Sequence, residues 1–154
     1  MRVLLVAVGK PRDPGLAAAI RDYETRAARY WPLEVREVKE ERQSGLSSDQ
    51  VRAREGERVA AAIPAASQLV ACDIGGDRMT SEEFARWLQA QREQARDVAF
   101  AIGGAFGLGD AVRTRAARRL ALAPWTLPHE LARLVLAEQL YRAGSIVRGE
   151  PYHK

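Results

Sequence analysis

The sequence predicts an α/β protein in which a mostly parallel sheet is flanked by helices. Short apolar runs of strand length alternate along the chain with longer amphipathic stretches of helix length. The run at 3–8, VLLVAV, is continuously apolar, which is typical of a parallel strand covered on both faces. The 154 residues contain no internal repeat and no linker, so we expect a single domain over 1–154.

Each element is predicted from its own pattern of residues. Strands are expected at 3–8, 33–38, 68–73, 98–102 and 120–123. Helices are expected at about 14–29, 48–63, 81–95 and 128–144. Ser47 with Gln50 and Thr80 with Glu83 have the spacing of capping boxes, which mark the starts of two of these helices.

Composition excludes several classes of protein. A chain with 47% hydrophobic and 29% charged residues is typical of a globular protein, not a disordered one. No run approaches the ~18 apolar residues of a membrane span, and the chain opens directly into a strand. Cys72, the one cysteine, excludes an internal disulfide and suits a reducing compartment. We therefore expect a cytoplasmic protein that does not enter a membrane.

The charge permits an anionic partner without requiring one. The net charge is +4, and all basic residues except Lys10, Lys39 and Lys154 are arginines. Arginine makes forked contacts with phosphate, although a compositional habit of the genome would give the same count. No set of Cys and His residues has metal-ligand spacing, so no metal is expected.

The C-terminal third carries the strongest indication of a ligand site. The strand at 98–102 runs into Gly103-Gly104, and the strand at 120–123 runs into the loop PWTLP. The third strand ends near Cys72. Carboxyl ends of parallel strands that lie side by side form the crevice in which ligands bind, but the sequence does not show that these three ends are neighbours. A glycine pair after a strand is more often a simple turn, and GAFGLG is not a dinucleotide fingerprint.

The last helix has two apolar stripes on roughly opposite sides. One stripe holds Ala132, Leu136, Leu140 and Ala143, and the other holds Leu131, Leu134, Val135 and Tyr141. A chain of this size offers little core for both, which favours a homodimer through this helix. Glu138 and Arg142 lie four residues apart within the second stripe, either as a structural ion pair or as charges held for a substrate.

Two further features have ordinary structural explanations beside functional ones. Cys72 ends an apolar strand and is more typical of a small core residue or a pocket wall than of a nucleophile. Four arginines fall within seven residues, and they are equally compatible with a solvated face and with RNA contact. They are Arg113, Arg115, Arg118 and Arg119.

Three motifs resemble one family over the full length of the chain. They are IGGAFGLG at 102–109, LALAPWTLPHELARLVLAEQLYRA at 120–143 and GEPYHK at 149–154, with MRVLLVAVGK at the start. These residues are similar to the RlmH family, the ribosomal RNA large-subunit methyltransferases of the SPOUT superfamily. The series LPHE…AEQLYRA…PYHK is highly specific for it.

The resemblance implies a fold and an activity. Members of the SPOUT superfamily tie the C-terminal region into a trefoil knot and bind S-adenosylmethionine (SAM) within it. The implied reaction methylates N3 of a pseudouridine in 23S ribosomal RNA of the assembled ribosome, with no metal. Because the side chains at the three strand ends offer almost no polar groups, we expect backbone atoms to hold the cofactor. The expected cofactor residues are Cys72, Gly103, Leu122, Ala123, Pro124, Trp125, Thr126 and Leu127.

The C-terminal tail is expected to be catalytic. Chain ends are usually disordered unless something holds them, but this tail combines a stiff Pro151, a Tyr152 able to stack on a base, and a Lys154 able to reach a phosphate. His153 has the side chain whose ordinary pKa of ~6.5 lets it accept a proton at neutral pH. We assign His153 as base or electrostatic assistant, Tyr152 as a stacking or positioning group, and Arg142 as the charge that orients them.

Two functions from other classes stay open. One is a non-catalytic RNA- or ribosome-binding protein with a relic pocket. The other is a small α/β enzyme that uses a different nucleotide, because glycine-rich loops fit many ligands.

Overall fold

Five parallel strands form one sheet in the computed structural model, which describes residues 1–153 except for the side chain of His153. The strands are β1 (Val3–Val8), β2 (Leu33–Val38), β3 (Gln68–Asp77), β4 (Val98–Ile102) and β5 (Arg118–Leu120). Their order is β2-β1-β4-β3-β5, and every pair is parallel. The predicted α/β fold class is therefore confirmed. The knot implied by the resemblance stays a prediction.

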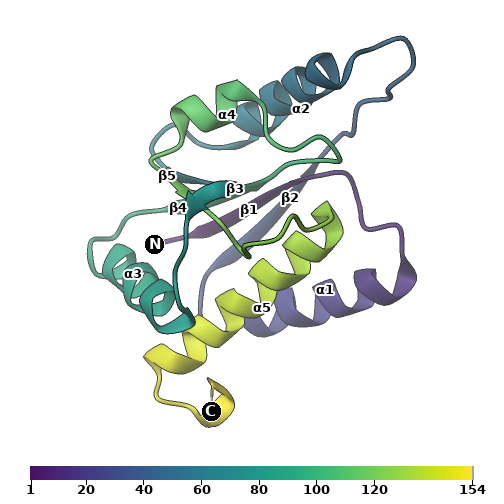
Figure 1. Ribbon diagram of the computed structural model, residues 1–154. Helices are drawn as coiled ribbons and strands as arrows, with labels where there is room; N and C mark the ends of the chain where they lie inside the picture. The colour runs from purple at the N-terminus through teal and green to yellow at the C-terminus, as the bar shows by residue number, and fades with distance from the viewer. Residues whose placement is uncertain (154) are drawn as a thin grey trace.

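Helices cover both faces of this sheet (Figure 1). They are α1 (Pro14–Ala27), α2 (Ser48–Ala62), α3 (Ser81–Glu93), α4 (Asp110–Arg115) and α5 (His129–Val147), followed by a 3₁₀ turn, η1 (Pro151–His153). Both predicted capping boxes are present, at Ser47 with Gln50 and at Thr80 with Glu83. No helix in the described part of the chain is long and apolar enough to cross a membrane.

The sheet separates two hydrophobic clusters. Alternate residues of β1 face opposite sides: Leu5 belongs to the cluster under α1, α3 and α5, and Val6 to the cluster under α2 and α4. The continuous apolar run of β1 is thus explained by burial on both faces, as predicted. Trp31 and Phe100 are the largest fully buried side chains and lie in the first cluster.

The third strand is longer than predicted. The sequence predicted a strand at 68–73, yet β3 continues through Gly75-Gly76 to Asp77, with an irregular register between Cys72 and Asp77. A Cβ at Gly76 would overlap the backbone at Arg119 and Leu120. The glycines therefore allow a close approach of β3 to β5. Glycine in a strand often marks such a close approach of two backbones.

The fifth strand lies earlier than predicted, at 118–120 in place of 120–123. It pairs only with β3, at the edge of the sheet, where exposed arginines are tolerated. The apolar residues after Leu120 leave the sheet, starting with Ala121, whose N–H still donates to the Asp77 carbonyl at 2.9 Å. Their apolarity reflects burial beside the sheet and not strand pairing.

Candidate functional site

The three strand ends that the sequence singled out are neighbours. β4, β3 and β5 are consecutive in the sheet and run in the same direction, with Ala71 opposite Ala101 and Cys72 opposite Leu120. Chain segments that are far apart in sequence therefore leave the sheet side by side, along the edge formed by the carboxyl ends of its strands. This edge has the arrangement in which open parallel sheets bind ligands.

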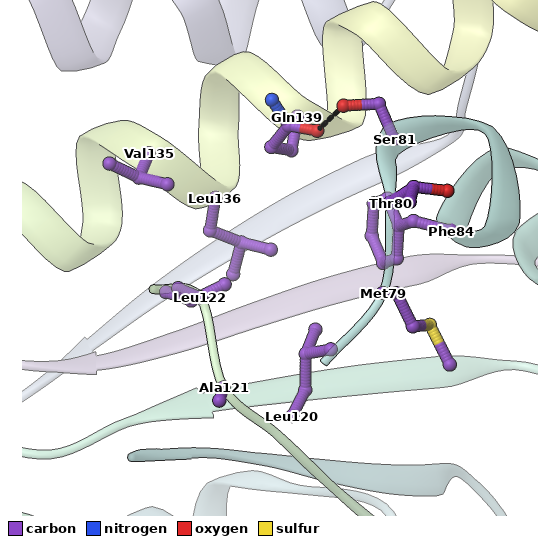
Figure 2. Close-up of a pocket in the computed structure, with 10 residues that line it drawn as sticks. All are labelled: Met79, Thr80, Ser81, Phe84, Leu120, Ala121, Leu122, Val135, Leu136 and Gln139. Atoms are coloured by element: carbon purple, nitrogen blue, oxygen red, sulfur yellow. Dashed lines mark hydrogen bonds between the residues drawn. The ribbon is translucent and has the colours of Figure 1, made fainter. Parts of the chain in front are cut away.

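A cavity of about 270 Å³ lies beside this edge. It lies between the chain after β3, the start of α3, the chain after β5 and the middle of α5, as Figure 2 shows. Its lining residues are Met79, Thr80, Ser81, Phe84, Leu120, Ala121, Leu122, Val135, Leu136 and Gln139. Mostly apolar walls with a few polar groups are typical of a small-molecule site.

The polar groups of the cavity are joined by hydrogen bonds to the second half of α5. The Ser81 hydroxyl donates to Gln139 Oε1 at 2.7 Å (Figure 2). The Gln139 amide in turn donates to Glu138 Oε2 at 2.7 Å. Glu138 thus connects the cavity wall, through its Oε2, to the residues that contact its Oε1.

That other oxygen brings together two of the three predicted catalytic residues. Glu138 Oε1 accepts hydrogen bonds from Arg142 Nε and Nη2 at 2.9 and 2.7 Å and from the Tyr152 hydroxyl at 3.0 Å. The Arg142 guanidinium also lies 4.9 Å from the centre of the Tyr152 ring. The Glu138–Arg142 pair foreseen from the sequence therefore exists, and the tail completes it.

The tail folds back on α5 up to the end of the described residues. Gly149, at a φ of +68°, turns the chain, and the Tyr152 ring packs 4.4 Å from that of Tyr141. The Tyr30 hydroxyl donates to the Glu150 carboxylate. The tail is thus held by specific contacts. The His153 side chain and Lys154 lie outside the described residues.

Burial and hydrogen bonding set the protonation of these groups. Burial, followed by hydrogen bonds to Tyr23 and Glu138, raises the pKa of Tyr152, so this phenol stays protonated at neutral pH. The hydrogen bond to Glu138 raises the pKa of Arg142, which stays a cation. Neither group accepts a proton under these conditions. Burial raises the pKa of the Cys72 thiol to about 12, which argues against a nucleophile.

Glycine is needed at position 103 because the loop that follows packs closely against it. A Cβ at Gly103 would overlap the backbone of Gly107 and Leu108. The left-handed conformation in this loop occurs at Gly107, at a φ of +82°, and the Gly107 N–H donates to the Gly104 carbonyl at 3.1 Å. A larger residue at 103 would therefore disturb the loop before it met a ligand.

The segment 122–127 is only partly enclosed. Leu122 lines the cavity, whereas Pro124, Trp125 and Thr126 are exposed, Trp125 by 80%. Of the eight predicted cofactor residues, Leu122 alone is among the residues that line this cavity. Gly103 directly follows β4, and Cys72 lies within β3, opposite Leu120.

The four arginines of the cluster make specific contacts within the fold. Arg119 donates to Asp73 Oδ2 at 2.7 Å, and Arg113 lies 3.2 Å from the same oxygen. Arg115 donates to three backbone carbonyls between residues 60 and 64. Arg118 lies over the Trp87 ring. All four arginines are used within the fold.

Several site residues had no distinct sequence signal. Thr80 and Ser81 were predicted only as the start of a helix, and Gln139 was not singled out. Glu138 was noticed for its spacing to Arg142, but its contacts with Gln139 and Tyr152 depend on the tertiary fold. Among the described residues, no group of three or more His, Cys, Asp or Glu side chains is arranged to hold a metal ion.

Together, the fold and the cavity define an α/β protein with a small-molecule site at the carboxyl ends of parallel strands. The family model described as "Predicted SPOUT methyltransferase" matches residues 1–153. The chain is 69% identical to ribosomal RNA large subunit methyltransferase H of Gemmatimonas aurantiaca over 154 residues, with 100% of both chains covered. It is 43% identical to the Geobacter sp. protein of the same name, with 99% of each covered.

A solved structure shares the fold. A probable methyltransferase from Bordetella pertussis Tohama I aligns with a TM-score of 0.53 at 15% identity, over 92% of this chain and 95% of that one. The chain therefore belongs to the SPOUT methyltransferases and, within them, to the family of ribosomal RNA large subunit methyltransferase H.

Proposed function

We propose that this protein transfers a methyl group from SAM to N3 of a pseudouridine in 23S ribosomal RNA of the assembled ribosome. The observation that carries the proposal is the chain of hydrogen bonds from the cavity through Gln139 and Glu138 to Arg142 and Tyr152. It joins a site for a small molecule to the tail in a member of a methyltransferase family.

The cavity has the chemistry that SAM requires. Apolar walls such as Leu122 and Leu136 suit an adenine ring, and the hydroxyl and amide groups of Thr80, Ser81 and Gln139 suit its polar parts. We propose that backbone groups of Cys72, Gly103 and 122–127 complete the site along the strand ends. When bound, SAM supplies a methyl group made electrophilic by its sulfonium.

The protein's residues then have distinct tasks at the acceptor. The imide nitrogen carries a weakly acidic proton that must leave during the reaction. Because Tyr152 and Arg142 hold their protons at neutral pH, we assign proton removal to His153. The Arg142 cation stabilises the negative charge that develops on the imide. The Tyr152 ring stacks on the pseudouridine ring and positions it.

Methyl transfer to ribosomes from a strain that lacks the modification tests this function. Labelled SAM should label 23S ribosomal RNA, and reverse transcription should stop at one position because an N3-methyl group blocks base pairing. His153→Ala should abolish labelling, while a surface control, Glu57→Gln, should not. A wild-type protein that labels no ribosomal RNA would exclude this function and favour a non-catalytic ribosome-binding protein.

Calorimetry separates the remaining alternative. SAM should bind, while ATP and NAD should not bind at the same concentrations. Tight binding of either nucleotide without SAM binding would identify an α/β enzyme of another kind.

We also propose that residues 1–154 act as one domain and that two copies form the active enzyme. The first apolar stripe of α5 is buried within the protomer, since Leu136 and Leu140 are 0% exposed. This stripe is therefore not available to a second copy. The second stripe retains an exposed residue, Leu131. With the exposed Trp125 it offers apolar surface for a second copy.

A further inference from the structure

A second cavity opens where β1, β2 and β4 end, on the α2 side of the sheet. It has a volume of about 440 Å³ and shares no lining residue with the cavity of Figure 2. Its walls come from the chain after β1, the chain after β2, α2 and the loop after β4. It therefore lies at the same edge of the sheet as the first cavity but beside different strands.

A buried acid with a free oxygen lines this cavity. Glu55 is 2% exposed, and its Oε2 accepts the Glu41 backbone N–H at 3.0 Å. Its Oε1 has no hydrogen-bond partner among the described residues. That oxygen faces the loop after β4, since it lies 2.8 Å from the position of a Cβ at Gly104. A buried carboxylate oxygen without a donor is unfavourable, so this position suits a ligand that supplies an N–H.

The surroundings of Glu55 disfavour the ionised form of its carboxyl group. Burial, and after it the charge of Glu40, raises the pKa of the Glu55 carboxyl. Glu41 is already neutralised by Arg58, with which it forms an ion pair. The donor that Glu55 lacks is therefore best supplied from the cavity.

An aromatic ring is presented next to this acid. Phe106 lines the cavity and stands in the tight turn that Gly104 and Gly107 close with a backbone hydrogen bond of 3.1 Å. It is half-buried and belongs to neither hydrophobic cluster. A ring held by a rigid turn outside the core is a stacking surface for a planar ligand.

Two arginines also line the cavity, together with the carboxylates of Glu40 and Glu41. Arg12 is 79% exposed at its side chain and pairs with Glu40 at 2.6 Å, and Arg42 forms no ion pair within residues 1–153. Guanidinium groups of this kind bind phosphate. A flat ring, a buried acceptor and exposed arginines are the groups with which proteins hold an unpaired nucleotide.

We propose that this second cavity binds one unpaired RNA nucleotide, with its base stacked on Phe106, a base N–H donated to Glu55, and its phosphate near Arg12 and Arg42. The inference rests on the proposed function, because it assigns the site to the RNA substrate. The nucleotide is distinct from the one that is methylated and fixes the position of the RNA on the enzyme.

Binding of short, labelled, single-stranded oligouridylate without SAM tests the site. The comparison probe is the same oligomer built from N3-methyluridine, which keeps the ring and phosphates but lacks the imide N–H. Wild-type protein should bind the unmethylated oligomer about tenfold more tightly by fluorescence anisotropy, the scale of one hydrogen bond to a charged group.

Two variants and a control identify the residues. In Glu55→Gln the amide oxygen must still accept the Glu41 N–H, which turns the NH₂ toward the free position, so the preference should disappear. Phe106→Leu should weaken binding of both oligomers by about tenfold. Glu57→Gln removes the same charge from an exposed position of the same helix and should keep the wild-type preference.

The results separate this site from the reaction. A Glu55→Gln protein that retains the preference, or a folded Phe106→Leu protein with unchanged affinity, overturns the nucleotide site even if ribosomes are methylated. Loss of the preference in Glu55→Gln while wild-type protein methylates no ribosomal RNA supports the site and overturns the proposed reaction alone.

Discussion

Tyr30 donates a hydrogen bond to the carboxylate of Glu150, which lies 120 positions further along the chain. The Tyr30 ring occupies the space left by Gly144 on α5, and the Arg148 guanidinium lies 4.7 Å from the centre of the same ring. Tyr30 therefore connects the end of α1 to the start of the tail. The position of Tyr152, two residues beyond Glu150, depends on this connection.

Removal of the Tyr30 hydroxyl should loosen the tail without changing the cavity. We expect Tyr30→Phe and Glu150→Ala each to lower methyl transfer by about tenfold, as for a hydrogen bond to a charged group, with unchanged SAM affinity. Because both variants remove the same bond, the double variant should be no worse than either single one. Additive losses would contradict a shared role.

The hydrogen bond between Tyr30 and Glu150 should also make Tyr30 lose its proton at an unusually high pH. The hydrogen bond to Glu150, followed by burial, raises the pKa of Tyr30 from 10.0 to about 12. A raised pKa means that the stability contributed by this phenol is fully present below pH ~10 and is lost as the pH rises through about 12. Ultraviolet titration of phenolate should show a late transition whose amplitude falls by one phenolate in Tyr30→Phe, because Tyr152, whose pKa is also raised, still titrates late in that variant. An unchanged late amplitude in Tyr30→Phe would assign the whole transition to other tyrosines.

Gly144 should be intolerant of any side chain. A Cβ at this position would overlap the Tyr30 ring, so Gly144→Ala should lower the free energy of unfolding by about 1–3 kcal/mol, the range for overpacked cores. Thermal or denaturant unfolding measures the change. Tyr30→Leu in the Gly144→Ala background should restore part of the loss, and its failure to do so would point to a backbone effect.

A chain truncated after Glu150 tests the catalytic tail. Tyr30–Glu150 is retained, so the protein should fold and bind SAM with near-normal affinity. Without Tyr152 and His153, methyl transfer should fall by about 100-fold or more, the scale of a lost acid–base group. Methylation of ribosomes at the full-length rate would show that these residues have no part in the reaction.

The dimer is tested most cleanly at Leu131. Because Leu136 and Leu140 are fully buried in the protomer, charges there would unfold the chain instead of separating subunits. Leu131→Glu places a charge on the exposed stripe and should yield a folded monomer by light scattering, with reduced methyl transfer. A fully active monomeric wild-type protein would exclude the dimer.

The sequence by itself determined the local elements. The apolar run of β1, the alternation of β2 and the two capping boxes depend on residues close in the chain, and these elements were predicted where they occur. The tail motif PYHK likewise identified the family, because its spacing from AEQLYRA is a property of the chain alone.

Only the tertiary structure decided which distant residues meet. The order β4-β3-β5 places the three strand ends side by side, and no local pattern encodes the order of strands in a sheet. The continuation of β3 through Gly75-Gly76 was not predicted, because the close approach to β5 that these glycines allow involves a partner more than 40 residues away. Glu138 became the link between the cavity and Tyr152, and Tyr30 the support of the tail, through side-chain contacts that form only when the chain packs.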